Sequence, residues 1–259
     1  MPVVLGRRSI MSNRVVVVTG GSSGIGKATA KLFARDGEHV VILSRTEKSG
    51  AETVAEIEAE GGSVLYLKTD IGHEDQVEAS FAKAAEKFGR IDILFANAAV
   101  QINKPIDETT KQDWDSMIAA NLTGTFLCCK AAAKYMKKQK SGSIVICSSG
   151  HAFMSYPGYT GYAATKGGQV AFMHACAIDL APFGIRVNCI IPGATESPLL
   201  TYHFSKHPED ERRILQKIPL GRFATGEDIA KGVRYLASAD ASYIAGSCLM
   251  VEGGLLAQG

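Results

Sequence analysis

Residues 15–26 read VVVVTGGSSGIG, and this segment is the clearest indicator of the fold class. The four valines at 15–18 are typical of a strand that is buried on both faces, as strands of parallel sheets are. Beyond the glycines, Ile25, Leu32 and Phe33 recur at helical spacing. The segment therefore predicts a strand, a tight glycine turn and a helix, which together begin a parallel α/β sheet.

The same alternation of apolar runs and helical patterns continues along the chain. Further strands are predicted at 40–43, 64–67, 91–96, 144–147, 187–191 and 248–251. Strands and helices that alternate in this way form right-handed crossovers in one parallel sheet. We therefore expect an α/β fold, a single doubly wound Rossmann domain at 14–259 with a seven-stranded parallel sheet and helices on both faces. Residues 1–13 carry no such pattern and are expected to be an N-terminal extension.

Composition excludes several other classes of protein. The 259 residues are 46% hydrophobic and 21% charged, which is ordinary for a globular chain with a sizeable core. The 28 basic and 26 acidic residues nearly balance, so no surface for nucleic-acid phosphates is expected. No apolar run reaches the roughly 20 residues of a membrane-spanning helix. The six cysteines lack Cys-x-x-Cys spacing and lie in apolar segments, which predicts buried free thiols in the reducing cytoplasm.

Segment 194–221 breaks the alternation of strands and helices. It contains Pro198, Pro208 and Pro219 and the charged run 209–213, and Pro208 is a suitable first residue for a helix. The segment follows the carboxyl end of a predicted strand, where sheets of this type bind ligands. We expect a substrate lid here, with a plain surface excursion as the alternative.

The glycine turn predicts a nucleotide site. Glycines between a first strand and a helix permit a tight turn and let backbone N–H groups approach a pyrophosphate at the helix N-terminus. The residues expected to bind a dinucleotide here are Gly20, Ser22, Ser23, Gly24, Ile25 and Gly26.

The residues after the second strand bear on the choice of dinucleotide. An acidic residue at this point would accept a hydrogen bond from the 2′-hydroxyl of NAD and repel a 2′-phosphate. The chain has Ser44, Arg45 and Thr46 there, and the first acid is Glu47. The Arg45 guanidinium suits phosphate oxygens, so NADP(H) is favoured. A solvated Arg45, with NAD(H) as the cofactor, is the alternative.

Tyr162 and Lys166 form a candidate catalytic pair. They are four residues apart in a helical segment, so their side chains project from the same face. A free tyrosine has a pKa of about 10, and a cation about 4 Å away can supply the roughly 4 kcal/mol that would lower it to ~7. Spacing of this kind also occurs by chance on surface helices.

Several motifs together resemble the short-chain dehydrogenase/reductase family, and the resemblance runs from about residue 14 to residue 254. The pattern Thr19-x-x-x-Gly24-x-Gly26 resembles the family's cofactor turn, and Asn97-Ala98-Ala99 resembles its Asn-Ala-Gly. Ser149 precedes Tyr162 by thirteen residues, which is the family spacing of the catalytic serine. Other positions that match family motifs are Asp70, Asn121, Pro192 and Gly193.

The resemblance implies a division of roles. Tyr162 would exchange a proton with the substrate oxygen, Ser149 would hydrogen-bond that oxygen, and Lys166 would lower the Tyr162 pKa and hold the nicotinamide ribose. Asn121 would position a water that links Lys166 to solvent, and Ser148 would be a structural neighbour. The remaining cofactor contacts that the resemblance implies are Asp70, Ile71, Asn97, Ala98, Pro192, Gly193, Thr195 and Ser197, beside Ser44, Arg45, Tyr162 and Lys166. No metal is implied, and the six histidines show no zinc-site spacing.

Two positions depart from the family pattern. Ser197 stands where the family usually has threonine and keeps the hydroxyl, whereas Ala99 replaces a glycine and is expected to alter the backbone fit beside the cofactor. Three aromatic residues near Tyr162 are candidates for the wall of the substrate pocket: His151, Tyr156 and Tyr159. For His151, an ordinary loop histidine is the equal alternative.

We predict an NADP(H)-dependent oxidoreductase that interconverts a ketone and a secondary alcohol, with a small polar or alicyclic substrate preferred. An NAD(H)-dependent sugar or polyol dehydrogenase and a 3-oxoacyl thioester reductase remain alternatives. From other classes, the alternatives are a non-catalytic NADP-binding regulator and a methyltransferase that binds S-adenosylmethionine. The resemblance also implies a homotetramer built through the Tyr162 helix and the C-terminal strand.

Overall fold

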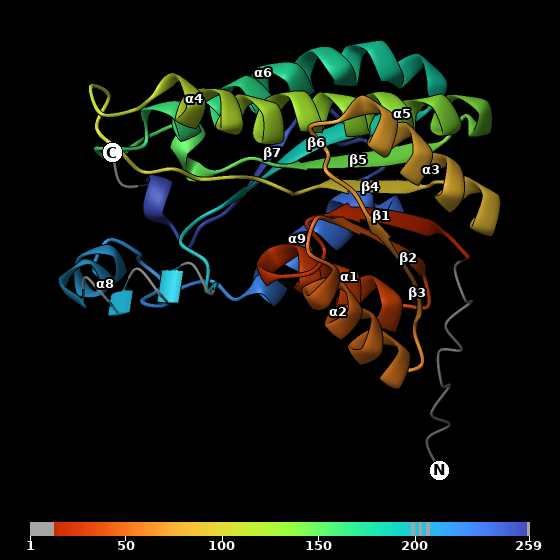
Figure 1. The fold of residues 1–259 in the computed structure, drawn as a ribbon, viewed down its shortest axis with the longest axis horizontal. Helices are drawn as coiled ribbons and strands as arrows, with labels where there is room; N and C mark the ends of the chain where they lie inside the picture. The colour runs from red at the N-terminus through yellow and green to blue at the C-terminus, as the bar shows by residue number, and fades with distance from the viewer. Residues whose placement is uncertain (1–12, 198–199, 202–203, 206–207, 258–259) are drawn as a thin grey trace.

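Seven parallel strands form one sheet in the computed structural model, which describes residues 13–197, 200–201, 204–205 and 208–257 (Figure 1). The strand order is β3-β2-β1-β4-β5-β6-β7. The strands are β1 (Val15–Thr19), β2 (His39–Ser44), β3 (Ser63–Lys68), β4 (Ile93–Ala96), β5 (Gly142–Cys147), β6 (Ile185–Pro192) and β7 (Cys248–Val251). The predicted doubly wound sheet and all seven predicted strands are confirmed. Of the predicted extension only Asn13 is described, and Pro198 of the predicted lid lies outside the described residues.

Helices cover both faces of the sheet (Figure 1). One face packs against α1 (Gly24–Arg35), α2 (Glu47–Ala59) and α9 (Gly226–Ala237), and the other against α3 (Glu74–Phe88), α5 (Gly124–Gln139) and α6 (Thr160–Leu180). The short helix α4 (Lys111–Met117) runs through a π-helical turn at Ile118–Thr123 into α5. Helix α8 (Pro208–Leu215) stands apart from both layers, within the predicted lid, and begins at Pro208 as predicted.

The order of the strands opens a crevice in the middle of the sheet. The chain adds β2 and β3 on one side of β1, then crosses to β4 on the other side. Connections from the carboxyl ends of β1 and β4 therefore run to opposite faces, and ligands of such sheets bind where they diverge.

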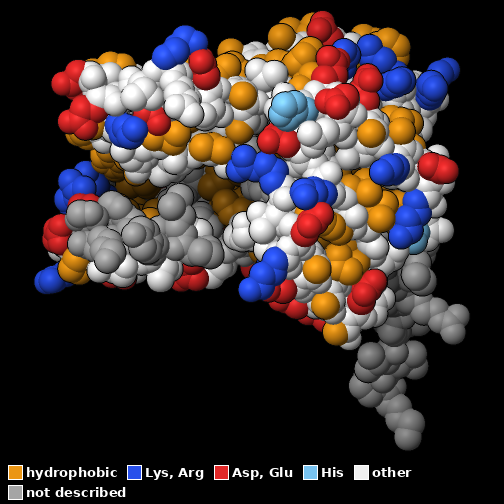
Figure 2. Space-filling view, viewed as in Figure 1, with side chains coloured by type: hydrophobic (Ala, Val, Ile, Leu, Met, Phe, Trp, Pro, Cys, Tyr) orange, Lys and Arg blue, Asp and Glu red, His pale blue; other side chains and the backbone are white. Residues whose placement is uncertain are grey.

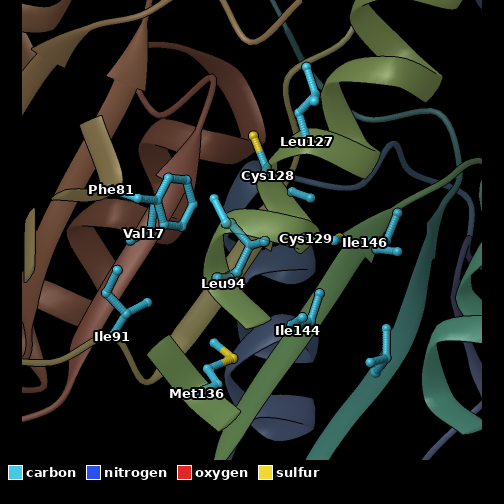
Figure 3. Close-up of a cluster of buried hydrophobic side chains, with 14 of the residues drawn as sticks. Val17, Phe81, Ile91, Leu94, Leu127, Cys128, Cys129, Met136, Ile144 and Ile146 are labelled. Carbon is cyan, nitrogen blue, oxygen red and sulfur yellow. The ribbon is translucent and has the colours of Figure 1, made fainter. Parts of the chain in front are cut away.

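Strand β1 has an apolar residue at each position from 15 to 18 because both of its faces are covered. Val15 and Val17 belong to the apolar layer beneath α3, α5 and α6, whereas Val16 and Val18 belong to the layer beneath α1, α2 and α9. Successive side chains of a strand point to opposite faces, so a strand covered on both faces needs apolar residues at every position. Figure 3 shows the first layer, in which Val17 lies with Phe81 and Met136 among other buried side chains.

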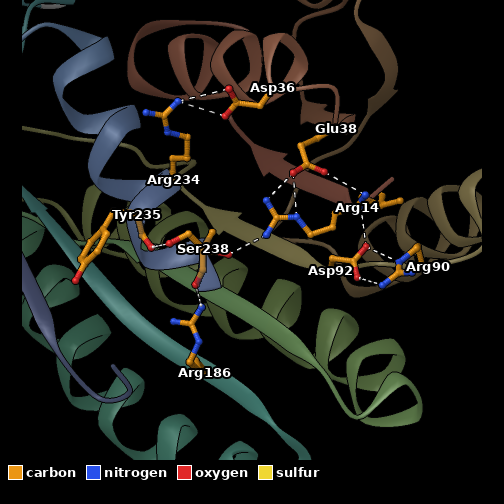
Figure 4. Close-up of polar contacts among 11 residues, drawn as sticks. Arg14, Asp36, Glu38, Arg90, Asp92, Arg186, Arg234, Tyr235 and Ser238 are labelled. Atoms are coloured by element: carbon orange, nitrogen blue, oxygen red, sulfur yellow. Dashed lines mark hydrogen bonds and ion pairs between the residues drawn. The ribbon is translucent and has the colours of Figure 1, made fainter. Parts of the chain in front are cut away.

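The amino-terminal end of β1 is held by two ion pairs (Figure 4). Arg14 Nε donates to the buried Glu38 carboxylate at 2.9 Å, and Arg90 Nε donates to Asp92 Oδ2 at 2.7 Å. Asp92 Oδ2 also accepts from the backbone N–H of Val15 at 2.8 Å. These contacts anchor β1 at the end of the sheet opposite the crevice.

Candidate active site

A cleft of about 800 Å³ lies at the carboxyl ends of the strands, beside the segment that carries α8 (Figure 2). The predicted site residues that line it are Gly20, Ser22, Ser23, Gly24, Ile25, Ser44, Arg45, Asp70, Ile71, Asn97, Ala98, Ser149, Tyr162, Lys166, Pro192, Gly193, Thr195 and Ser197. Gly26 and Asn121 are buried and do not line the cleft. The fold thus brings together residues that the sequence spreads over most of its length.

The glycine turn forms one wall of the cleft. Gly20 and Gly24 have φ values of +66° and +49°, in the left-handed region that glycine adopts most easily. A Cβ at Gly26 would lie 2.3 Å from the carbonyl oxygen of Gly20, so a larger residue does not fit there. Helix α1 begins at Gly24 and has no acidic residue in its first turn. The unshielded helix N-terminus fits a dinucleotide pyrophosphate.

Thr19 fastens the turn to the loop that follows β4. Its fully buried side-chain oxygen accepts from the backbone N–H of Asn97 at 2.9 Å and of Ala98 at 3.0 Å. The Asn97 side-chain amide donates to the Thr19 carbonyl oxygen at 3.0 Å. Sequence reasoning treated Thr19 only as part of a motif. The signal for its role was a hydroxyl residue that ends an otherwise apolar strand.

The backbone at Ala99 explains how alanine replaces the family glycine. Lys140 is the one non-glycine residue with positive φ in the described part of the chain, so Ala99 has an ordinary backbone conformation. The altered backbone fit that was expected at Ala99 is therefore not accompanied by backbone strain.

Groups at the end of β2 fit a ribose or a phosphate. The Ser44 hydroxyl oxygen is buried and has no hydrogen-bond partner in the described structure. Arg45 is exposed and pairs with no described residue, while Glu47, the next acid along the chain, lies 3.3 Å from Lys68 Nζ. A buried hydroxyl without a partner is costly unless a ligand supplies one.

Ser149, Tyr162 and Lys166 meet at the centre of the cleft. Tyr162 and Lys166 lie one turn apart on α6, with Lys166 Nζ 5.4 Å from the Tyr162 ring centroid. Ser149, two residues beyond β5, lines the cleft with Tyr162 and acts to lower the pKa of its phenol. Ser148 Oγ donates to the Lys166 carbonyl oxygen at 2.9 Å and so ties the end of β5 to α6. This is the structural position expected of Ser148.

The acid–base properties of the pair differ from the sequence expectation. Burial raises the pKa of the Tyr162 phenol, although the neighbouring Ser149 acts in the opposite direction. Lys166 is buried, and its Nζ donates to the Cys147 carbonyl oxygen at 2.7 Å. Burial also lowers the pKa of the Lys166 amine. The lowering of the Tyr162 pKa by Lys166 stays a prediction, because burial is the largest influence on that pKa in this structure.

Asn121 lies behind the site, in the π-helical turn. Its side chain accepts from the backbone N–H of Val100 at 2.7 Å and donates to Thr165 Oγ1 at 3.0 Å. Its main-chain oxygen accepts from Gln169 Nε2 at 2.7 Å. Asn121 thus joins the loop after β4 to α6. The participation of Gln169 was not predicted, and a polar residue on the buried face of α6 was the available signal.

Aromatic rings surround Tyr162. His151 stacks on Tyr159 with centroids 4.1 Å apart and lies edge-on to Tyr162 at 5.7 Å. Tyr156 lies edge-on to His151 at 5.8 Å, and all four rings line the cleft. Burial lowers the pKa of His151 to about 4. His151 was expected to be either part of the pocket wall or an ordinary loop histidine, and its place in the cleft lining supports the pocket wall.

Other features of the chain restrict the chemistry. The six cysteines are free thiols, of which Cys176 and Cys248 are only partly buried. Across the described residues, no cluster of three or more His, Cys, Asp or Glu side chains is arranged to hold a metal ion. In the same part of the chain, no helix combines the length and the apolar character needed to cross a membrane.

Comparison with known proteins gives consistent relatives. The family model described as enoyl-(acyl carrier protein) reductase matches residues 20–256. Cyclopentanol dehydrogenase of Comamonas testosteroni is 35% identical over 95% of this chain and 98% of its own. A 3-oxoacyl-(acyl-carrier-protein) reductase of Thermotoga maritima is 36% identical over 95% and 99%. The crystal structure of levodione reductase superposes with a TM-score of 0.91 at 32% identity, over 96% and 100% of the two chains.

Proposed function

The chain belongs to the short-chain dehydrogenase/reductase family of NAD(P)(H)-dependent oxidoreductases, and we propose that it interconverts a ketone and a secondary alcohol with NADP(H). The observation that carries this proposal is the meeting of Ser149, Tyr162 and Lys166 in the cleft that the glycine turn also lines. A nucleotide-binding regulator or a methyltransferase has no use for a phenol, a hydroxyl and an amine at that point.

In the proposed mechanism, Tyr162 is the general acid of reduction. Its raised pKa keeps the phenol protonated at neutral pH, which is the form that donates a proton to a carbonyl oxygen. The Ser149 hydroxyl, next to the phenol, donates a hydrogen bond to the same oxygen as negative charge develops. When bound, a nicotinamide would supply or accept the hydride. Lys166, on the turn after Tyr162, would hold the ribose hydroxyls and stabilise the phenolate formed by proton transfer.

NADP(H) is supported by the groups at the end of β2. No acid directly follows the strand to repel a 2′-phosphate. The first acid along the chain, Glu47, forms an ion pair with Lys68. Arg45 and the buried Ser44 hydroxyl lie together in the cleft lining. A guanidinium and a hydroxyl are the partners that phosphate oxygens prefer.

We infer a small uncharged substrate, with an alicyclic ketone or alcohol favoured. Among the described lining residues, the charged side chains are Arg45, Asp70 and Lys166, and the first two lie at the β2 and β3 side of the cleft. Aromatic and aliphatic side chains surround Tyr162 instead. The names of two relatives, cyclopentanol dehydrogenase and levodione reductase, point the same way.

The chain is further proposed to act as a cytoplasmic homotetramer. The free thiols support a reducing compartment.

Apolar side chains are exposed on α5 and α6, among them Phe126 at 46% and Ile178 at 76%, and Met250 on the edge strand β7 is 41% exposed. Of these three elements, α6 and β7 are the ones through which the homotetramer was expected to form. Segment 194–221, with α8, is proposed as the substrate lid.

Replacing Tyr162 by phenylalanine tests the proposed chemistry. Tyr162→Phe is expected to lower kcat by about 10² to 10⁴-fold, because the proton donor is lost, while the Kd for NADPH changes little. Turnover of cyclic ketones is followed by NADPH absorbance, and Tyr243→Phe, at a fully exposed tyrosine, is the matched control. A wild-type protein that binds NADPH but reduces no ketone and oxidises no alcohol would instead favour the regulator.

Replacing Arg45 by alanine tests the cofactor preference. Arg45→Ala is expected to raise the Kd for NADPH by about 10 to 100-fold, because charge-assisted hydrogen bonds to the 2′-phosphate are lost, and to leave the Kd for NADH nearly the same. Both constants are measured by fluorescence titration. Lys48→Ala, which removes another exposed positive charge nearby, is the control. An equal effect on both nucleotides contradicts NADP(H) specificity.

A further inference from the structure

His151 holds a hydrogen-bonding atom in the cleft that no described residue uses. Its ring is fixed on one side by Tyr159, which stacks on it with an interplanar angle of 13°. His151 lies edge-on to Tyr162, at 79° between the ring planes. The imidazole is thus held in place beside the phenol that meets the substrate oxygen.

The contacts of Ser155 indicate which ring nitrogen of His151 carries the hydrogen and which can accept a hydrogen bond. Ser155 Oγ donates to the Tyr156 carbonyl oxygen at 3.5 Å, and it lies 3.2 Å from His151 Nδ1. A hydroxyl has one hydrogen, so a Ser155 that donates to Tyr156 accepts from Nδ1–H of His151, and we take this tautomer. Burial lowers the pKa of His151 to about 4, so the ring is neutral at neutral pH. A neutral ring protonated on Nδ1 has a lone pair on Nε2, which accepts hydrogen bonds.

The rings of Tyr156, Tyr159 and Tyr162 pack around His151, and the Tyr156 hydroxyl is buried with no hydrogen-bond partner in the described structure. Among the lining residues of the described chain, the aliphatic ones include Met154, Leu200, Ile214, Leu255 and Leu256. Lys217 lies over the Tyr156 ring, 4.9 Å from its centroid, but does not line the cleft. A neutral accepting nitrogen pairs with an uncharged group that carries a hydrogen, such as a hydroxyl.

We propose that His151 Nε2 accepts a hydrogen bond from a second hydroxyl group of the substrate, on a carbon next to the reacting carbon. The site then takes uncharged cyclic diols, and the hydroxyketones formed from them, in preference to simple alcohols. This inference rests on the proposed function, because Tyr162 must bind the reacting oxygen. His151 is a substrate-positioning residue in this scheme.

A pair of matched substrates tests the proposal. The ratio of kcat/KM for trans-1,2-cyclohexanediol to that for trans-2-methoxycyclohexanol is measured with NADP⁺, because the methoxy group keeps the oxygen but lacks the hydrogen. We expect a ratio of about 10 in the wild type, because the diol can form one hydrogen bond that the methoxy compound cannot. His151→Phe keeps the stacked ring and is expected to bring the ratio near one. His151→Gln restores an accepting oxygen and is expected to recover part of it.

The control is His174→Phe, the same substitution at an exposed histidine of α6, which is expected to keep the wild-type ratio. A wild-type ratio near one, or a ratio that His151→Phe leaves unaltered, overturns the proposal. If the wild type oxidises other secondary alcohols but neither of the pair, the proposal fails and the proposed function stands. If it oxidises no secondary alcohol at all, both fail.

Discussion

At the scale of the residue, burial outweighs charge at Tyr162. A cation about 4 Å away at an effective dielectric constant of ~20 is worth about three pKa units to a phenol. Lys166 Nζ donates to the Cys147 carbonyl oxygen and lies 5.4 Å from the Tyr162 ring centroid, and burial is the largest influence on the Tyr162 pKa. Desolvation therefore determines the direction of the Tyr162 pKa. A ribose hydroxyl beside Lys166 would offer the amine a different partner, which makes the Tyr162 pKa sensitive to the bound cofactor.

The depressed pKa of His151 predicts a loss of stability in mild acid. The pKa is about 4 in the folded protein against an ordinary 6.5, so between these values the unfolded chain binds the proton and the folded chain does not. Stability is therefore fully present above about pH 6.5 and falls as the pH drops toward 4. We expect this residue to contribute about 1 to 2 kcal/mol of the loss, because its ring retains some solvent contact.

The measurement compares urea unfolding of the wild type and His151→Phe at pH 7 and pH 4.5. The variant lacks the titrating group, so its free energy of unfolding is expected to fall less over this interval. His174→Phe serves as the control for removing an exposed histidine. Identical pH dependence of the wild type and His151→Phe would contradict the prediction.

At the scale of the element, the site depends on joints between segments that are distant in sequence. Thr19 at the end of β1 organises the loop after β4 through the N–H groups of Asn97 and Ala98. The π-helical turn carries Asn121, which links that same loop to α6. A π-helical turn widens the helix by one residue and often occurs at functional sites. Both joints place the loop after β4 beside the catalytic pair.

Thr19→Val is expected to weaken this joint. Valine has nearly the shape of threonine, but it leaves the N–H groups of Asn97 and Ala98 without an acceptor. We expect a loss of about 2 to 6 kcal/mol in the free energy of unfolding, from two buried donors at roughly 1 to 3 kcal/mol each, and weaker NADPH binding. Denaturant unfolding and nucleotide titration measure the two effects. Thr19→Ser keeps the oxygen, and a loss as large as that of Thr19→Val would argue against the hydrogen bonds as the cause.

At the scale of the whole molecule, the cleft and the exposed apolar surfaces lie on different elements. The cleft lies at the carboxyl ends of the strands, whereas the exposed Phe126 belongs to α5 and stacks edge-on against Phe172 of α6 at 6.3 Å. Large apolar side chains on adjoining helices are typical of surfaces that are covered in an assembly. Assembly through α5 and α6 would therefore leave the cleft open to substrate.

Phe126→Glu is expected to break the proposed homotetramer. A carboxylate in an apolar contact between subunits loses its hydration without a partner, so the interface through α5 and α6 should separate and leave dimers. Light scattering with size-exclusion chromatography is expected to report a wild-type mass about four times the 27.5 kDa of one chain. Ile106→Glu, at an isoleucine that is 65% exposed on another segment, is the control. A monomeric wild type would refute the assembly.

The features that could be predicted from the sequence are those that depend on neighbours along the chain. A strand buried on both faces must be apolar at every position, so the valines at 15–18 predicted β1. A tight turn before a helix needs glycine, and the positive φ values at Gly20 and Gly24 confirm that local requirement. Tyr162 and Lys166 share a helical face by spacing alone. The parallel arrangement of the sheet followed from the alternation of strands and helices, whereas the strand order is known only from the structure.

What could not be predicted depends on burial and on contacts between distant segments. The direction of the Tyr162 pKa follows from how deeply the packed fold buries its side chain. The role of Thr19 follows from the position of the loop after β4. The neutral state of His151 follows from the rings packed around it. Spacing along a chain carries no information about desolvation, and these properties arise only when the packed fold removes water from each group.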